Sequence, residues 1–358
     1  MSVPSATQIV QESAQKNDWC LCIFFSVDIE GATAYKVETR ARTRDDEWRS
    51  TDDDWCFLFE SFYVDFPECF LSEYSVLANT QATKTIQEPT HPALWKFIGD
   101  EILFYAPLSD SCQTLEHIRA FHQAIVNYNA KLRVQGVKVR CKGTVWLVGF
   151  PNNNRIVLIP PGDTVCQTAS NSLIDFVGSS TDCGFRLTKY SSSRMLVVSL
   201  DLLWMLMESI KRYETATCFE FIRRRIRYAG KHELKGIFSG KPYPVFWIDS
   251  LAKPPVEDKW TNMAVCECDD IIRFCEEFSE SANPNDFIRP FVFGDPSGLF
   301  IDIPHSFELR RDMFIRYKTK ATKQTAEAQP ETHIHHEGDT EQLLDGMPKI
   351  TSHVRSLG

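Results

Sequence analysis

Ile23-Phe24-Phe25-Ser26-Val27-Asp28-Ile29-Glu30-Gly31 is an apolar run, typical of a buried β-strand, that ends at a carboxylate. A second run reads Trp95-Lys96-Phe97-Ile98-Gly99-Asp100-Glu101-Ile102-Leu103-Phe104, with Gly-Asp between two apolar arms, as at the tip of a hairpin. Carboxylates on neighbouring strands can share divalent cations, which prefer oxygen ligands and leave positions open for substrate phosphates. Asp28 and Asp100 are therefore candidate metal ligands.

The composition predicts an intracellular protein with a large hydrophobic core. The chain has 358 residues, of which 43% are hydrophobic, so we expect one large domain with an appendage, or two domains. A net charge of -9 argues against general nucleic-acid binding. The 12 cysteines lack Cys-x-x-Cys spacing, which favours reduced thiols. Because no signal segment or membrane-spanning run is present, we expect a cytoplasmic location and no membrane partner.

The hydrophobic pattern predicts an α+β fold, a mainly antiparallel sheet with helices on one face. A helix is expected to begin near residue 178, where Ser179, Ser180 and Thr181 offer hydroxyls to unpaired backbone donors. Strands are expected over 19–27, 137–150 and 195–200, helices over 55–66, 114–132, 202–210 and 268–278, and a final hairpin over 227–235 and 243–248.

A third stretch, Asp175-Phe176-Val177-Gly178-Ser179-Ser180-Thr181-Asp182-Cys183-Gly184-Phe185-Arg186, completes a pattern with the first two. Asp-Ile-x-Gly, Lys-x-x-Gly-Asp and Asp-x-x-Gly-(six residues)-Phe-Arg, in that order, resemble the class III nucleotidyl cyclases over roughly residues 17–251. The third stretch and residues 142–151 are similar to the bacterial pyrimidine cyclases of the Pycsar antiphage system. The resemblance implies a palm (ferredoxin-like) domain that forms a head-to-tail homodimer.

With this resemblance the chain divides into four expected segments. Residues 1–16 would be a flexible N-terminal arm or a short helix, and residues 17–251 the cyclase catalytic domain. Residues 252–318 would form a C-terminal extension, since Pro254-Pro255 marks a boundary. Residues 319–358 are polar and weakly periodic, so we expect disorder there.

The resemblance implies a reaction in which the ribose 3′-hydroxyl of a nucleoside triphosphate attacks its own α-phosphate and expels pyrophosphate. Positioning and charge stabilisation carry such catalysis. Two divalent ions, Mn²⁺ or Mg²⁺, would bind Asp28 and Asp100, with help from the backbone carbonyl of Ile29. One ion would lower the pKa of the 3′-hydroxyl, and the other would hold the β- and γ-phosphates.

The resemblance also implies the other half of the site. Arg186 corresponds to the transition-state arginine, and its fixed charge suits a developing pentavalent phosphate. Asp182 stands where many adenylyl cyclases carry an asparagine that orients the ribose. Lys235 matches the approximate position of a triphosphate-binding lysine, with Lys231 and Lys241 as alternatives.

Two pairs of residues bear on the base. Lys96 and Asp175 are at the positions that purine cyclases use on the base edge, which keeps adenine as an alternative. Phe62 and Tyr63 are bulky aromatic residues on the helix expected beside the base, and they would shrink the pocket to fit one ring. The alternative for both is inward packing in the core.

We therefore predict a uridylate cyclase that converts UTP to 3′,5′-cyclic UMP, a second messenger for antiphage defence that acts on a separate effector. Cytidylate cyclase, adenylate cyclase and a catalytically silent nucleotide-sensing dimer remain alternatives. In the implied homodimer, the metal aspartates of one subunit face Lys96, Asp175 and Arg186 of the other.

Overall fold

A computed structural model of the chain describes part of its residues, and two compact units are distinguished, Met1–Phe314 and Ile315–Gly358. All elements discussed below belong to the first unit. The predicted tail, 319–358, lies outside the described residues except for Lys320. The described residues are 4–16, 18–42, 55–79, 89–151, 153–159, 173–213, 222–251, 253, 255–259, 266–283, 286–305, 307–309, 312–313, 316 and 320.

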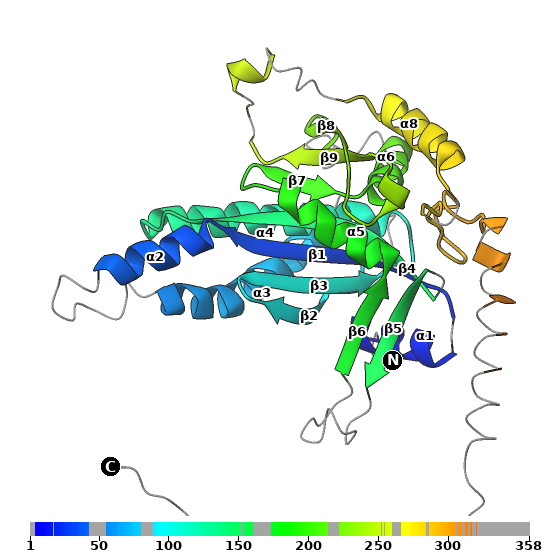
Figure 1. Ribbon diagram of the computed structural model, residues 1–358, viewed down its shortest axis with the longest axis horizontal. Helices are drawn as coiled ribbons and strands as arrows, with labels where there is room; N and C mark the ends of the chain where they lie inside the picture. Colours follow the sequence, from blue (N-terminus) through cyan, green and yellow to red (C-terminus); the bar gives the residue numbers. More distant parts are fainter. Residues whose placement is uncertain are drawn as a thin grey trace, which may run out of the picture. The chain divides into compact units, whose positions relative to one another are not determined.

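The centre of the described structure is a seven-stranded sheet with the order β2-β3-β1-β4-β7-β9-β8 (Figure 1). Neighbouring strands of this sheet pair antiparallel, except for β4 and β7, which pair parallel. This confirms the predicted α+β class, and β8–β9 is the predicted final hairpin. The strands are β1 (Cys20–Glu30), β2 (Ala93–Ile98), β3 (Glu101–Pro107), β4 (Arg140–Phe150), β7 (Met195–Val198), β8 (Ile226–His232) and β9 (Tyr243–Asp249).

The main helical layer covers one face of this sheet (Figure 1). Alternate residues of β1 point to this face, where the Phe25 ring lies 5.2 Å from Phe70 and 5.1 Å from Phe121. The predicted helices are confirmed, each with longer bounds. They are α3 (Trp55–Asn79), α4 (Gln113–Val134), α6 (Leu200–Arg212) and, in the C-terminal extension, α8 (Cys268–Ser281), while α2 (Ala32–Arg42) follows β1 directly.

A smaller cluster covers the other face and includes a hairpin that the sequence patterns did not predict. Its strands, β5 (Asn154–Ile159) and β6 (Leu173–Gly178), form a separate two-stranded sheet. Phe176 of β6 packs on Phe24 of β1, with ring centroids 4.9 Å apart. The N-terminal segment contributes α1 (Ala6–Lys16), whose Ala6 and Val10 are buried in the same cluster. This hairpin carries Asp175 toward the edge strand β2.

Helix α5 (Ser179–Leu187) begins where expected, but its first donors are satisfied differently. No cap hydrogen bond comes from its own N-cap residue, Gly178. Instead, Asn154 of β5 accepts from the Ser180 N–H at 3.0 Å, so the cap comes from a neighbouring strand. Gly184 lets α5 approach β4 closely, because a Cβ at that position would lie 2.1 Å from the Trp146 ring. The helix is therefore held tightly over Trp146.

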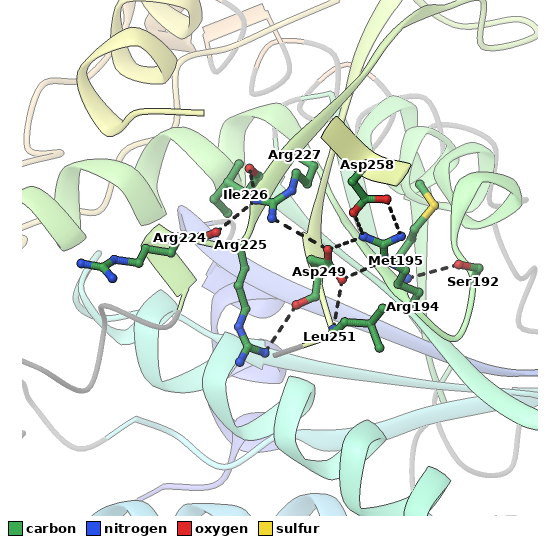
Figure 2. Close-up of polar contacts among 10 residues, drawn as sticks. All are labelled: Ser192, Arg194, Met195, Arg224, Arg225, Ile226, Arg227, Asp249, Leu251 and Asp258. Atoms are coloured by element: carbon green, nitrogen blue, oxygen red, sulfur yellow. Dashed lines mark hydrogen bonds and ion pairs between the residues drawn. The ribbon is translucent and has the colours of Figure 1, made fainter. Parts of the chain in front are cut away.

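A partly buried ion-pair network ties the start of the C-terminal extension to the end of β9 (Figure 2). The Arg194 guanidinium donates to both carboxylate oxygens of Asp249, at 3.0 and 2.6 Å, and also to Asp258 of the 3-10 helix Val256–Lys259. Asp249 is fully buried. Arg227, from the basic run 223–227, is also buried and donates to backbone carbonyls of Arg224 and Ile226, so its role is structural.

Within the described residues, no helix is long and apolar enough to cross a bilayer. Helix α8 packs on α6, and its Ile271 and Cys275 are buried in the main core. The described part of the extension up to residue 314 therefore shares that core.

Candidate active site

Asp28 and Asp100 come together at the end of β1 and the tip of the β2–β3 hairpin. Gly99 adopts a φ of 62°, which favours glycine and makes the tight turn. The Ile29 N–H donates to the Asp100 carbonyl at 3.3 Å, which joins the turn to β1. Burial raises the pKa of Asp28, and the Asp100 charge adds to the rise, while Lys142 opposes it. The two predicted aspartates therefore form one electrostatic site.

Glu101 is a third carboxylate of this site, and the sequence analysis did not single it out. It stands directly opposite Asp28 in the β1–β3 register, so both side chains lie on one face. The Ser26 hydroxyl donates to Glu101 Oε1 at 2.5 Å. Burial raises the pKa of Glu101, and the charges of Asp28 and Asp100 raise it further. Its position immediately after Gly99-Asp100 is the signal that could have found it.

Lys142 is a basic residue on the other side of Asp28. It stands opposite Asp28 in the β1–β4 register, and its Nζ lies 3.1 Å from Asp28 Oδ2. Only 20% of the Lys142 side chain and 26% of the Asp28 side chain are exposed. Glu101, Asp28 and Lys142 thus form a row across three neighbouring strands.

The predicted base-edge residues Lys96 and Asp175 meet within one chain. Lys96 Nζ lies 2.7 Å from Asp175 Oδ1, and the Trp95 indole N–H donates to the same oxygen at 3.0 Å. The Phe176 backbone N–H is a third donor to it, also at 3.0 Å. Within the described residues, Asp175 Oδ2 accepts no hydrogen bond, so this oxygen can accept one from a ligand.

Asp182 and Arg186 are both exposed on α5, four residues apart and so on one side of the helix. Phe185 anchors the same helix on the sheet. Its ring centroid lies 6.0 Å from that of Trp95 and 5.8 Å from that of Trp146. Strand alternation puts Asp28 on the same sheet face as Phe24, which stacks on Trp146. The two groups of predicted residues therefore share a face of the sheet.

Phe62 and Tyr63 differ in what they contact. Phe62 has 0% exposure and packs among core aromatics, so the structure corrects its expected place beside the base to a place in the core. Tyr63 donates its hydroxyl to the Gly99 carbonyl, and its ring lies 4.6 Å from Phe97. Burial raises the pKa of Tyr63, and the Asp100 charge adds to this. Tyr63 thus supports the Gly99-Asp100 hairpin rather than the Lys96–Asp175 pair.

The candidate lysines for the triphosphate lie in and beside the β8–β9 connection. Lys235 and Lys241 are exposed there. Lys231, at the end of β8, places its ammonium 5.8 Å from the centre of the Phe274 ring. The described contacts do not bring Lys235 to the other predicted residues.

The residues around Asp28 fit a hard divalent cation. Carboxylates of Asp28 and Asp100 and the carbonyl of Ile29 are an all-oxygen set, which Mg²⁺ and Mn²⁺ prefer. Within the described residues, no cluster of three or more His, Cys, Asp or Glu forms a metal cage. A magnesium site of one or two carboxylates completed by water and substrate phosphates needs no such cage.

Comparison with known proteins finds similarity at the level of structure. No protein-family model and no curated protein matches the chain. The adenylyl cyclase CyaB from P. aeruginosa is 12% identical, with a TM-score of 0.38, over 66% of this chain and 96% of that chain. The guanylate cyclase domain of RhGC from Catenaria anguillulae, in complex with GTP, is 13% identical, with a TM-score of 0.39, over 64% and 95%.

A bacterial light-regulated adenylyl cyclase is 12% identical, with a TM-score of 0.39, and the match covers 72% of this chain and 99% of that chain. These similar structures are all nucleotidyl cyclases.

Proposed function

We propose that this protein is a metal-dependent nucleotidyl cyclase that converts UTP to 3′,5′-cyclic UMP and pyrophosphate. The observation that carries the proposal is the joining of Asp28 and Asp100 by the hydrogen bond from Ile29 to the Asp100 carbonyl. A second observation supports the proposal: Asp28 lies on the same face of the sheet as the Lys96–Asp175 pair and α5. A metal-binding half and a base-binding half are what a cyclase requires.

Asp28, Asp100 and the Ile29 carbonyl would hold two divalent ions, Mn²⁺ or Mg²⁺. When bound, such ions acidify the attacking hydroxyl and stabilise charge on the transferring phosphate. Gly31 links β1 directly to α2, whose first N–H groups can donate hydrogen bonds to a phosphate oxygen of the substrate. The chain itself thus positions the triphosphate, and no covalent intermediate is needed.

Arg186 and Asp182 would act on the reacting groups from the second half of the site. Both are exposed on a helix whose other side is anchored on Trp146 and Trp95, so they can contact a ligand without unfolding the helix. We propose that they serve the metal half of a second copy in a head-to-tail homodimer. Arg186 would neutralise charge on the α-phosphate, Asp182 would orient the ribose, and Lys235 would bind the triphosphate.

The Lys96–Asp175 pair would read the base edge. Asp175 Oδ1 already accepts three hydrogen bonds, which leaves Oδ2 as an acceptor beside the Lys96 ammonium as a donor. Uracil offers the matching pair, N3–H and a carbonyl oxygen. Cytosine and adenine also offer an adjacent donor and acceptor, so cytidylate and adenylate cyclase remain alternatives.

The preference for uracil and the role in antiphage defence rest on the resemblance of residues 142–151 and 175–186 to the Pycsar cyclases. The product would then be a second messenger for a separate effector. The competing class is a silent nucleotide-sensing dimer, which has no use for paired metal aspartates.

The test is incubation of the purified protein with ATP, GTP, CTP and UTP separately, in Mn²⁺, with products identified by mass spectrometry. We expect cyclic UMP from UTP, and loss of product in Asp28→Asn and Asp100→Asn variants. Cyclic CMP or cyclic AMP as the main product would reassign the substrate. Binding of UTP without any cyclic product would favour the sensor.

A further inference from the structure

We infer that Lys142 is a resident counter-ion of Asp28 that a metal ion must displace, so that metal binding depends on the arrival of the nucleotide. This inference rests on the proposed function and concerns the same site. Lys142 is not one of the proposed metal ligands, base-edge residues or phosphate-binding residues.

The geometry puts Lys142 on one of the two carboxylate oxygens of Asp28. Register pairing fixes it opposite Asp28, and its Nζ lies 3.1 Å from Asp28 Oδ2. Both side chains are mostly buried, so solvent screens this pair less than a surface pair. A cation that binds Asp28 through Oδ2 must therefore break a partly desolvated ion pair.

The local charges also favour a displaceable lysine over a permanent one. Asp28, Asp100 and Glu101 bring three negative charges to the site, and Lys142 brings one positive charge. Lys142 thus compensates part of the repulsion in the absence of metal. A triphosphate adds acceptors that bind an ammonium strongly, and the flexible four-carbon stem of lysine lets that ammonium move to them.

The experiment measures Mn²⁺ affinity of the full chain by electron paramagnetic resonance of free Mn²⁺, with and without a UTP analogue that cannot cyclise. Lys142→Met keeps the length of the side chain and removes its charge. Without nucleotide, we expect this variant to bind Mn²⁺ roughly tenfold more tightly than the wild type, as the loss of a charged hydrogen bond predicts. The nucleotide should then tighten Mn²⁺ binding less than it does in the wild type.

Lys138→Met is the matched control, because it removes one positive charge from an exposed lysine that lies 3.9 Å from Glu38. It should leave Mn²⁺ affinity unchanged. Lys142→Gln, which keeps a polar group, should behave as Lys142→Met does and guards against a folding defect. Equal or weaker Mn²⁺ binding by both Lys142 variants, in folded protein, would overturn the inference.

Asp28→Asn separates this inference from the proposed function. If Asp28→Asn abolishes Mn²⁺ binding while the Lys142 variants bind like the wild type, the metal site stands and only the inference fails. If Asp28→Asn leaves Mn²⁺ binding unchanged even with nucleotide, the metal site itself fails, and the proposed function with it.

Discussion

Lys96 and Asp175 lie 79 residues apart in the sequence, and their Nζ and Oδ1 atoms meet at 2.7 Å. Lys96 belongs to the edge strand of the seven-stranded sheet and Asp175 to the separate hairpin. The contact between Trp95 and Phe176, with centroids 5.1 Å apart, joins the two sheets beside this pair. One protomer therefore holds the proposed base-edge pair assembled before any second copy binds.

Trp95→Phe should weaken substrate binding while it preserves the fold. The change removes the indole N–H that donates to Asp175 Oδ1 and keeps a ring to pack on Phe176 and Phe185. The loss of a hydrogen bond to a charged group predicts a rise of about tenfold in the KM for UTP, with a smaller change in kcat. Steady-state kinetics of cyclic UMP formation measure both constants.

Trp19→Phe is the control for this prediction. It removes an indole donor that bonds the Phe291 carbonyl at 3.0 Å, outside the proposed site. It should leave the KM unchanged. If Trp95→Phe also leaves the KM for UTP unchanged, Trp95 does not position Asp175 for the base.

Mixing two inactive variants should restore activity if the sites are shared between subunits. Asp28→Ala removes the proposed metal half and Arg186→Ala removes the proposed other half of each site. A heterodimer then has one intact site out of two, so an equal mixture should reach about a quarter of wild-type activity. Subunit exchange should first be verified by mass spectrometry. If activity then does not recover, the result counts against the head-to-tail dimer.

Asp201 should make stability depend on pH. Burial raises the pKa of Asp201 to about 6, although its carboxylate accepts from the Ser199 hydroxyl and the Leu202 N–H. The folded state thus holds this proton more tightly than the unfolded state does. The free energy of unfolding should therefore fall as pH rises from the ordinary pKa of 3.8 through about 6.

Asp201→Asn should remove this dependence. A shift of about two pH units corresponds to at most about 3 kcal/mol, which the wild type loses across that interval. Urea unfolding followed by circular dichroism at several pH values measures the slope for both proteins. An identical slope in Asp201→Asn and the wild type would show that other groups carry the dependence.

Arg194→Met should destabilise the protein strongly. It leaves the carboxylate of Asp249, which has 0% exposure, without its bidentate partner (Figure 2). Breaking a buried pair by removing one partner costs about 3–5 kcal/mol. Arg273→Met is the control, because Arg273 and Asp270 form an exposed pair whose loss should cost less than about 0.5 kcal/mol. Thermal unfolding of both variants tests this, and equal stability would contradict it.

The sequence by itself determined the features that depend on local patterning. The strand that carries Asp28, the Gly99-Asp100 hairpin and the long helices follow from apolar periodicity and turn residues, which act over a few residues. Each aspartate lies in a strand or turn that neighbouring residues define. The pairing of Asp28 with Asp100 depends on the contact between β1 and β3, and it was expected from the family resemblance rather than from local patterning.

Only the tertiary structure decided which distant side chains lie beside these residues. Glu101 and Lys142 flank Asp28 because of the register of three strands, and a shift of one residue would turn both side chains to the other face. Phe62 and Tyr63 are adjacent in α3, yet the helix rotation puts Phe62 in the core and Tyr63 against the hairpin. Such placements depend on long-range packing, which a local pattern of residues does not encode.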